Sequence, residues 1–277
     1  KILGVIADPV AHSLSPLIHN ALIRKMCLNM IYLPFRVPRE NLHQFVEACP
    51  EMGIKGLSVT IPHKETCLKC INVLDDDVAG IKACNTIVFD GNNAFGYNTD
   101  CTAAMESIEQ TLTDKYPDEA VFEGRKFLLM GAGGVARAIA FSLVRRKAKV
   151  FITARDYKKS EALADWLKCD TVEWEDRGEF VPSVLVNCTP VGMHPKMDVS
   201  PYDAKCFERE MIVFDTIYNP ERTLLIKQAR DFGCTTITGV DMFMRQAAKQ
   251  FKLFTGIEGN LDDARFELKR ATSAAKY

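Results

Sequence analysis

The stretch Phe127-Leu-Leu-Met130-Gly131-Ala-Gly133-Gly134-Val-Ala136 joins an apolar strand to a glycine-rich turn, and a helical run from Arg137 to Arg146 follows. This succession of strand, turn and helix is the context that a dinucleotide-binding fingerprint requires. The first glycine allows a tight turn, the second lets the backbone approach a pyrophosphate, and the final alanine lets the helix pack against the strand. A turn that serves packing alone is the alternative. We predict a nucleotide site formed by Gly131, Ala132, Gly133, Gly134, Val135 and Ala136.

Further strands are predicted downstream of this turn, separated by helical or loop segments. They cover residues 150–153, 171–174, 184–187, 211–215 and 235–238. The alternation predicts a doubly wound sheet of the Rossmann type. A last helix is expected from Asp241, with Gly256 as its terminator.

The first hundred residues show the same alternation of strands and helices. Strands are predicted at 2–7, 30–37 and 56–61, with helices starting at Pro16 and Glu40. This order indicates a mostly parallel sheet with crossover helices. A hairpin is expected next, because residues 84–90 and 94–98 flank the turn Gly91-Asn92-Asn93.

The length of 277 residues predicts two α/β domains rather than one core. We expect a substrate-binding catalytic domain at 1–101 and a dinucleotide-binding domain at 102–241. Helices at 242–277 would then return to the first domain. The chain opens on Lys1 directly before a predicted strand, so we expect it to be a trimmed or excised chain.

Charge and composition exclude several classes of partner. The 35 Lys and Arg residues balance 36 Asp and Glu residues and are interspersed with them, so no nucleic acid or anionic membrane surface is expected to bind. The longest charge-free stretch, residues 180–195, is too short and too rich in proline to span a membrane. The 10 cysteines are scattered singly, which indicates a reducing cytoplasm. Cys67 and Cys70 have metal-ligand spacing, but no second pair completes a site, so we expect no metal.

The residues after the strand at 150–153 bear on the choice of cofactor. Ala154, Arg155 and Asp156 follow it directly, with Lys159 close behind. An acidic residue at this place would hold a free ribose 2'-hydroxyl, whereas arginine would favour a 2'-phosphate. Both residue types are present, and a solvated charge cluster is the plain alternative.

Four polar segments lie near the predicted strand ends of the first domain. They supply the neutral hydrogen-bonding groups of Ser13, Ser15, Thr60 and Asn85 and the charged groups of Lys64 and Asp100. Ligands of open α/β sheets bind beyond the carboxyl ends of strands, so these groups could converge on one small, hydroxylated or carboxylated molecule.

Each of these residues also has a plain structural explanation. Ser15 before Pro16 would cap a helix, Thr60 would be a strand residue, and Asn85 a turn former. Asp100 would be a helix N-cap and Lys64 a solvated surface residue. Three histidines of this half of the chain are expected to be packed or hydrogen-bonded rather than catalytic, because nothing links them to a triad: His12, His19 and His63.

Together these segments give the chain a resemblance to the shikimate dehydrogenase family over nearly its whole length. The matching motifs are Ser13-Leu-Ser15-Pro16, Val59-Thr60-Ile-Pro62-His63-Lys64, Asn85-Thr86, Asn98-Thr99-Asp100, Gly131-Ala-Gly133-Gly134, Asn187-Cys-Thr189-Pro190-Val-Gly192-Met193, Asp215-Thr-Ile-Tyr218-Asn-Pro220 and Gly239 to Gln246. The resemblance implies reversible, NADP-dependent reduction of 3-dehydroshikimate to shikimate. It also implies a two-domain fold whose C-terminal helix rejoins the substrate domain.

The resemblance also implies a role for individual residues. Lys64 and Asp100 would be the catalytic pair, and Ser13 and Ser15 would hold the substrate carboxylate. The remaining substrate-binding residues would be Thr60, Asn85, Tyr218 and Gln246. Besides the glycine-rich turn, the cofactor would meet Ala154, Arg155, Lys159, Thr189 and Gly239.

Two departures from the family pattern leave alternatives open. Ser58 stands where many members have Asn, which admits a relative with a covalently linked dehydroquinate dehydratase domain outside this chain. Asp156 admits NAD, although we expect NADP, with Arg155 at the family's arginine position and Asp156 turned away to pair with Lys159. A quinate dehydrogenase is the rival enzyme. A catalytically silent NADP-binding sensor is the other rival, and the intact pair of Lys64 and Asp100 argues against it.

Overall fold

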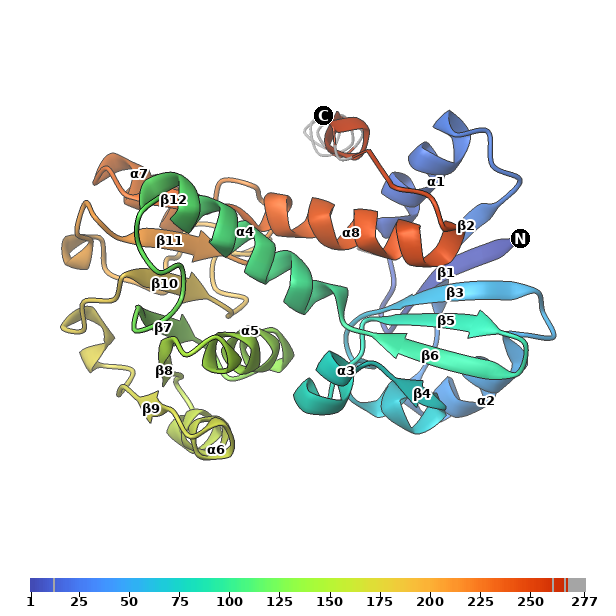
Figure 1. The fold of residues 1–277 in the computed structure, drawn as a ribbon, viewed down its shortest axis with the longest axis horizontal. Coiled ribbons are helices and arrows are strands. Elements are labelled where there is room, and N and C mark those ends of the chain that lie inside the picture. The colour runs from blue at the N-terminus through green and yellow to red at the C-terminus, as the bar shows by residue number, and fades with distance from the viewer. Residues whose placement is uncertain (12, 261, 267, 269–277) are drawn as a thin grey trace. The chain divides into compact units, whose positions relative to one another are not determined.

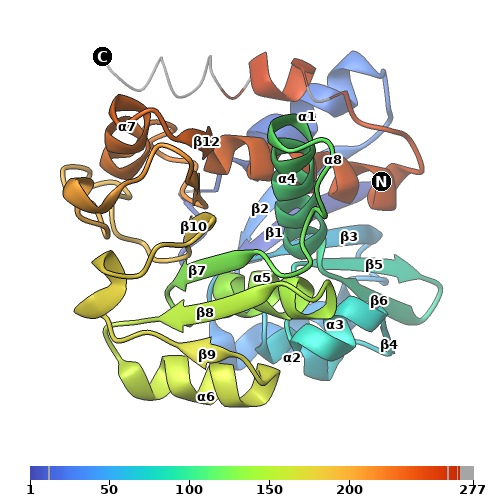
Figure 2. The same ribbon diagram turned by 60° about the vertical axis from the view of Figure 1, so that its left-hand side comes forward.

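The computed structural model describes residues 1–11, 13–260, 262–266 and 268. The chain divides into two units (Figures 1 and 2). Residues 1–100 and the described residues from 244 onward form the first unit, and residues 101–243 form the second. The binding roles expected for these units stay predictions at this point.

Within the described residues, the first unit contains a six-stranded mixed sheet. β1 pairs in parallel with β2 and β3, whereas β5 runs antiparallel to β3 and to β6. The strands lie in the order β2 (Ile31–Arg36), β1 (Ile2–Ala7), β3 (Ile54–Val59), β5 (Thr86–Asp90), β6 (Asn93–Tyr97) and β4 (Val73–Leu74). The reversal at β5 and β6 turns both ends of the predicted hairpin toward the edge where β3 ends.

Helices pack on this sheet through apolar side chains. In α2, Leu42, Val46 and the following Cys49 are buried, as the helical spacing of these residues predicts. The C-terminal part of α8 lies so close to β3 that a Cβ added at Gly56 would come within 2.3 Å of the Phe254 ring. The helical elements are α1 (Ser15–Lys25), η1 (Arg39–Asn41), α2 (Leu42–Ala48), η2 (Thr66–Cys70), α3 (Asp76–Ile81) and α8 (Gly239–Thr255), whose residues from Met244 belong to this unit.

The second unit has a six-stranded sheet in the described residues, and all of its strand pairs are parallel. Its strands lie in the order β12 (Thr235–Ile237), β11 (Ile212–Asp215), β10 (Val184–Asn187), β7 (Lys126–Met130), β8 (Lys149–Thr153) and β9 (Asp170–Thr171). α5 packs on β7 and β8, α6 packs on β8 and β9, and α7 packs on β11 and β12. These helices are α5 (Gly134–Arg145), α6 (Tyr157–Leu167) and α7 (Leu224–Asp231), and the unit also contains most of α4 (Thr99–Lys115), with η3 (Asp176–Gly178) and η4 (Ala204–Cys206).

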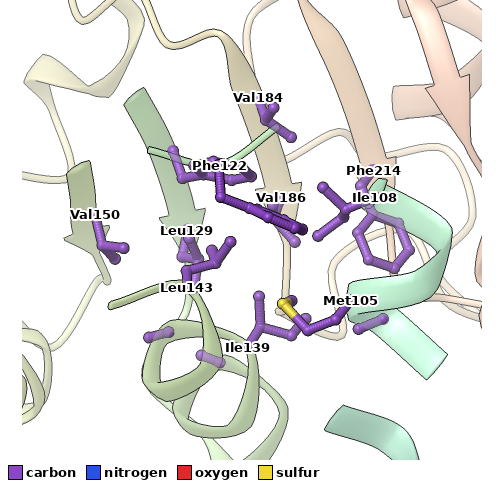
Figure 3. Packing of buried hydrophobic residues seen from close by; sticks show 14 of the residues in the cluster. Met105, Ile108, Phe122, Leu129, Ile139, Leu143, Val150, Val184, Val186 and Phe214 are labelled. Atoms are coloured by element: carbon purple, nitrogen blue, oxygen red, sulfur yellow. The ribbon is translucent and has the colours of Figure 1, made fainter. Parts of the chain in front are cut away.

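Figure 3 shows the core of this second unit. Met105 and Ile108 of α4 and Ile139 and Leu143 of α5 gather with Phe122 over the strands. The strands are apolar on both faces because helices cover both, as is usual for parallel sheets. This rigid parallel sheet supports the turns at its strand ends.

The predicted elements agree with the structure except at a few places. β1 and β10 have the predicted bounds, the strand predicted at 56–61 lies two residues earlier as β3, and the strand predicted at 171–174 is limited to Asp170–Thr171. It stops early because the chain turns at Trp174, whose ring packs against the Arg177 guanidinium at 4.1 Å. α3 and β4 are short and were not predicted. Among the described residues, no helix combines the length and the apolar character needed to cross a bilayer.

Candidate active site

The predicted catalytic residues lie at one edge of the first sheet. Lys64 follows β3, Asn85 precedes β5, and Asp100 follows β6. The register pairs Thr86 with both Ser58 and Tyr97, so these three chain segments meet at the same edge. The expectation that Asn85 follows a strand end is therefore wrong, because β5 is antiparallel and its beginning, not its end, lies here.

Lys64 and Asp100 form an ion pair. Lys64 Nζ donates a hydrogen bond to Asp100 Oδ2 at 2.6 Å, and the two side chains are only 21% and 15% exposed. The Lys64 carbonyl oxygen accepts a 2.7 Å hydrogen bond from the Cys84 N–H, which ties the turn after β3 to the residue before Asn85. Lys64 is therefore not the solvated surface residue of the plain alternative.

Asn85 holds the start of α4. Its Oδ1 accepts 2.8 Å hydrogen bonds from the Thr99 N–H and the Thr86 hydroxyl, and its Nδ2 donates to Thr99 Oγ1 at 2.9 Å. Asn85 is buried, and the residue that it binds directly precedes Asp100. The amide thereby fixes the backbone that presents the Asp100 carboxylate. Thr86 and Thr99 lie inside the quoted motifs, but no role was predicted for either of them.

Ser13 and Ser15 lie at the start of α1. Ser13 Oγ accepts a hydrogen bond from the Ser15 N–H at 3.4 Å. The helix begins at Ser15 with Pro16 in its first turn, and the capping residue, Leu14, makes no side-chain cap bond. The explanation of Ser15 as a helix cap therefore does not hold, and its hydroxyl instead interacts with the phenol of Tyr32.

Thr60 connects β1 to the turn that carries Lys64. Its N–H donates to the Ile6 carbonyl oxygen at 3.2 Å, and its own carbonyl oxygen accepts from the His63 N–H at 2.8 Å. Thr60 lies just beyond β3 and is half-buried, so it is not a strand residue.

A buried chain of hydrogen bonds runs beneath these residues and was not predicted. The Tyr32 hydroxyl donates to Ser58 Oγ at 2.6 Å, Ser58 donates to Gln250 Oε1 at 2.7 Å, and Gln250 Nε2 donates to Thr86 Oγ1 at 2.9 Å. Burial holds the pKa of the Tyr32 phenol above its usual value. One signal was available for Gln250, because it lies one helical turn after the predicted Gln246, and both side chains are buried.

His19 and His63 are packed residues, as expected. The His19 ring stacks on Tyr32 at 4.4 Å with an interplanar angle of 8°, and burial lowers its pKa to about 4. His63 Nε2 lies 2.7 Å from the Val37 carbonyl oxygen. His12 lies outside the described residues.

In the second unit, four predicted cofactor residues and the predicted substrate residue Tyr218 follow the carboxyl ends of neighbouring strands. Gly239 follows β12, Tyr218 follows β11, Thr189 follows β10, Gly131 follows β7 and Arg155 follows β8. These are five consecutive strands of one parallel sheet, so all five residues lie along the same edge. Ligands of doubly wound sheets bind at this edge.

The glycine-rich turn fits an anionic group. Gly131 has φ +111°, and a Cβ there would lie 3.1 Å from the Cys188 carbonyl oxygen, so this turn requires glycine. A Cβ at Gly133 or Gly134 would meet nothing within 4 Å, which leaves open space beside the backbone. α5 begins here with no acidic residue in its first turn and no side-chain cap. Its free amides and its dipole therefore favour a phosphate group.

The charged residues after β8 separate as expected. Lys159 Nζ lies 3.4 Å from Asp156 Oδ2, and both side chains are exposed. Arg155 is exposed, and within the described part of the chain no ion pair or hydrogen bond engages it. The arrangement leaves one guanidinium free at the end of β8 while the neighbouring carboxylate is paired.

The other predicted residues of this edge are held by their surroundings. Thr189 Oγ1 donates to Asn187 Oδ1 at 2.7 Å, and the Tyr218 ring stacks on Phe243 at 4.4 Å. Gly239 lies against the backbone after β11, because a Cβ there would come within 2.2 Å of the Ile217 carbonyl oxygen. Gly239 is thus needed for close packing at this point.

Comparisons with known proteins agree with this geometry. The family model described as "Shikimate dehydrogenase substrate binding domain" matches residues 5–87. The shikimate dehydrogenase (NADP(+)) of Caldanaerobacter subterraneus subsp. tengcongensis is 37% identical over 264 residues, which cover 92% of this chain and 92% of that protein. A crystal structure of a shikimate dehydrogenase in complex with NADP+ superposes with a TM-score of 0.89 at 34% identity, covering 98% of this chain and 96% of the other.

A longer relative also matches. The chloroplastic bifunctional 3-dehydroquinate dehydratase/shikimate dehydrogenase of Arabidopsis thaliana is 34% identical over 269 residues, which are 93% of this chain but 44% of that protein. The family predicted from the motifs is confirmed by these similarities. The chain belongs to the shikimate dehydrogenase family.

Proposed function

We propose that the protein catalyses the reversible, NADP-dependent interconversion of shikimate and 3-dehydroshikimate. The observation that carries this proposal is the 2.6 Å pair of Lys64 and Asp100, because it places a proton donor and an acceptor together at one sheet edge. Relatives named for this activity match over more than nine-tenths of the chain, which supports the same assignment.

The catalytic pair would act on the reacting oxygen of the substrate. Reduction of a ketone leaves negative charge on its oxygen, and a donor aimed at that oxygen stabilises the transition state. Lys64 Nζ would hold a proton there, while Asp100 keeps the ammonium in place through Oδ2. The second carboxylate oxygen of Asp100 would accept a hydrogen bond from a substrate hydroxyl. In the oxidative direction the same ammonium would stabilise the alkoxide that forms.

Neutral side chains would bind the rest of the substrate. We propose that the Ser13 and Ser15 hydroxyls bind the carboxylate, since Ser15 is the first residue of α1 and Ser13 lies two residues before it. Thr60, Asn85 and Gln246 would bind ring hydroxyls in the first unit. Tyr218 is the substrate-binding residue proposed from the second unit.

The second unit fits NADP. The free amides and open space at Gly133 and Gly134 would accommodate the pyrophosphate, within the turn from Gly131 through Ala132 and Val135 to Ala136. Arg155 would bind the 2'-phosphate through paired, charge-assisted hydrogen bonds, and Lys159 would add positive charge nearby. When bound, NADP supplies the hydride acceptor or donor. Ala154, Thr189 and Gly239 would line its remaining surface.

A steady-state assay with shikimate or quinate, each with NADP+ or NAD+, tests this function. We expect shikimate with NADP+ to give the highest kcat/KM, with 3-dehydroshikimate identified as the product. A higher kcat/KM with quinate would replace the assignment by its rival within the family. Absence of turnover with every combination, in a protein that still binds NADP+, would indicate a nucleotide sensor instead.

Two proposals concern the setting of the enzyme. We propose a reducing, cytoplasmic compartment, because all 10 cysteines are free thiols. We also propose a covalently linked dehydroquinate dehydratase domain outside residues 1–277, as in the bifunctional Arabidopsis relative. The intact mass of the protein purified from its native source tests the second proposal. A mass near that of these residues alone would contradict it.

A further inference from the structure

Asp215 is a buried carboxylate in the second unit for which the proposed chemistry has no use. It ends β11, and it is the one acidic side chain buried among the described residues. Oδ1 accepts hydrogen bonds from Asn187 Nδ2 and from the Ile217 N–H, each at 3.1 Å. Oδ2 accepts from Thr223 Oγ1 at 2.6 Å. One carboxylate therefore joins the end of β10, the turn after β11 and the start of α7.

The bond to Asn187 helps to orient that amide, whose Nδ2 also donates to the Val191 carbonyl oxygen at 3.3 Å. With Nδ2 directed to Asp215, Asn187 Oδ1 is left to accept from both the N–H and the hydroxyl of Thr189, at 2.9 Å and 2.7 Å. A reversed amide would turn Oδ1 toward the Asp215 carboxylate and Nδ2 toward the two donor groups of Thr189, so the bonds to Asp215 and to the Thr189 N–H would be lost. Asp215 thereby fixes Thr189 without touching it.

The bond to Ile217 acts on the neighbouring turn. It holds the backbone immediately before Tyr218, whose ring stacks on Phe243. The opposite side of this segment is closed by Gly239, which leaves no room for a side chain against the Ile217 carbonyl oxygen. The turn is thus held between a hydrogen bond and a close backbone contact.

The three partners favour an ionised carboxylate, because each of them donates a hydrogen bond to it. Asn187 Nδ2 and the Ile217 N–H can only donate, and the Thr223 hydroxyl also accepts from the Ile226 N–H while it donates to Asp215. Burial raises the pKa of Asp215 to about 6, and the three hydrogen bonds oppose that rise. Keeping this charge buried costs desolvation free energy. Such a cost is characteristic of residues with a functional role.

We propose that Asp215 is a positioning residue that holds Thr189 and Tyr218 in place for cofactor and substrate. The inference rests on the function proposed above. Asp215 acts through Asn187 and through the backbone at Ile217, and it is not itself a catalytic residue. Its removal would displace groups that meet the reactants, and small displacements of such groups have large effects on rate.

The experiment compares variants along this network. Asp215→Asn keeps the shape but removes the negative charge and replaces one acceptor oxygen by an NH2 group, and Thr223→Val removes one of the three bonds. Thr223→Ser keeps the hydroxyl, and Asp203→Asn changes an exposed capping carboxylate at η4 that accepts from the Lys205 N–H at 3.0 Å. For each protein we would measure kcat, the shikimate KM, the NADP+ Kd by titration calorimetry, and the thermal midpoint.

We expect Asp215→Asn to lower kcat/KM for shikimate at least about tenfold and to raise the NADP+ Kd at least about threefold. Thr223→Val should shift both quantities in the same direction, whereas Thr223→Ser and Asp203→Asn should stay within about twofold of wild type. Variants that fold and lose only thermal stability, with kcat/KM and Kd unchanged, would show a merely structural role and overturn the proposal.

The two remaining outcomes are also decisive. If Asp215→Asn does not fold, the comparison of Thr223→Val with Thr223→Ser tests the network by itself. If wild-type protein does not turn over shikimate, the proposed function has failed, and the NADP+ Kd of the variants then decides on Asp215 alone.

Discussion

Lys64 and Asp100 lie 36 residues apart in the chain, yet the Lys64 ammonium donates a 2.6 Å hydrogen bond to the Asp100 carboxylate. The contact depends on the antiparallel turn of β5 and β6, which returns the chain to the edge where β3 ends.

Substitution of Lys64 tests the proposed chemistry. We expect Lys64→Ala to lower kcat at least about a hundredfold, with a smaller change in KM, because a positioned donor acts mainly in the transition state. Lys55→Ala, at an exposed position of β3, serves as the control and should keep wild-type kcat. A folded Lys64→Ala protein with near wild-type kcat would contradict the catalytic role.

Substitution of the two serines tests the proposed carboxylate site. Ser13→Ala and Ser15→Ala should each raise the KM for shikimate, because hydroxyls that bind the carboxylate in both ground and transition states contribute uniform binding. The KM for NADP+ should stay near the wild-type value, which serves as the internal control. An unchanged shikimate KM together with a lower thermal midpoint would point instead to a role in the start of α1.

Arg155 tests the recognition of the 2'-phosphate. We expect Arg155→Ala to weaken NADP+ binding by about 1.5–3 kcal/mol, the range for a charge-assisted hydrogen bond, and to leave NAD+ binding nearly unchanged. Calorimetric titration with both nucleotides measures the difference. An equal loss for both nucleotides, or a wild-type preference for NAD+, would assign the ribose to Asp156 instead.

Lys159 is expected to influence cofactor choice through its ion pair with Asp156. Lys159→Ala should lower the preference for NADP+ over NAD+ by about two- to fivefold, the scale of an exposed ion pair, because it frees a carboxylate that repels the 2'-phosphate. The neighbouring Lys158→Ala is the matched control. Addition of Asp156→Asn to Lys159→Ala should restore the preference, and failure to do so would mean that Lys159 binds the phosphate directly.

The buried His19 should make the free energy of unfolding depend on pH. Its pKa falls from 6.5 to about 4 on burial, so between these values the unfolded chain binds a proton that the folded chain does not. Acid therefore favours unfolding through this group, and the contribution is lost as pH falls below 6.5. The His19→Phe variant lacks this titrating group. Its deficit in unfolding free energy relative to wild type should therefore be about 2 kcal/mol smaller at pH 5 than at pH 7. Urea unfolding of both proteins measures it, and a constant difference would contradict the lowered pKa.

Local patterns were enough to predict much of the fold. The turn from Gly131 to Ala136 is recognisable because a tight strand-to-helix connection needs particular residues within one short segment. The strands of the second unit are apolar on both faces, and such runs are visible without knowledge of their partners. The short elements α3 and β4 contain too few residues to show such a pattern, and neither was predicted.

Contacts between distant segments were the main omission. Ser58 and Gln250 are 192 residues apart, and nothing in either local sequence indicates that their side chains share a hydrogen bond. Tyr32 lies in an apolar strand and has the pattern of a core residue, so its buried hydroxyl gave no signal. The sequence predicted that Lys64 and Asn85 belong to one site, but the direction of β5 had to come from the structure.

The hairpin of β5 and β6 has one end beside the site and its turn at the other end. Its two-residue turn connects Asp90 to Asn93, and Gly91 in this turn has φ +56°. The pair Thr86 and Tyr97 lies at the other end of the ladder, beside the site. The turn is exposed, and it lies at the opposite end of the ladder from Asn85 and Asp100. The exposed tip is therefore the part of this hairpin best suited to carry a fluorophore or an affinity tag.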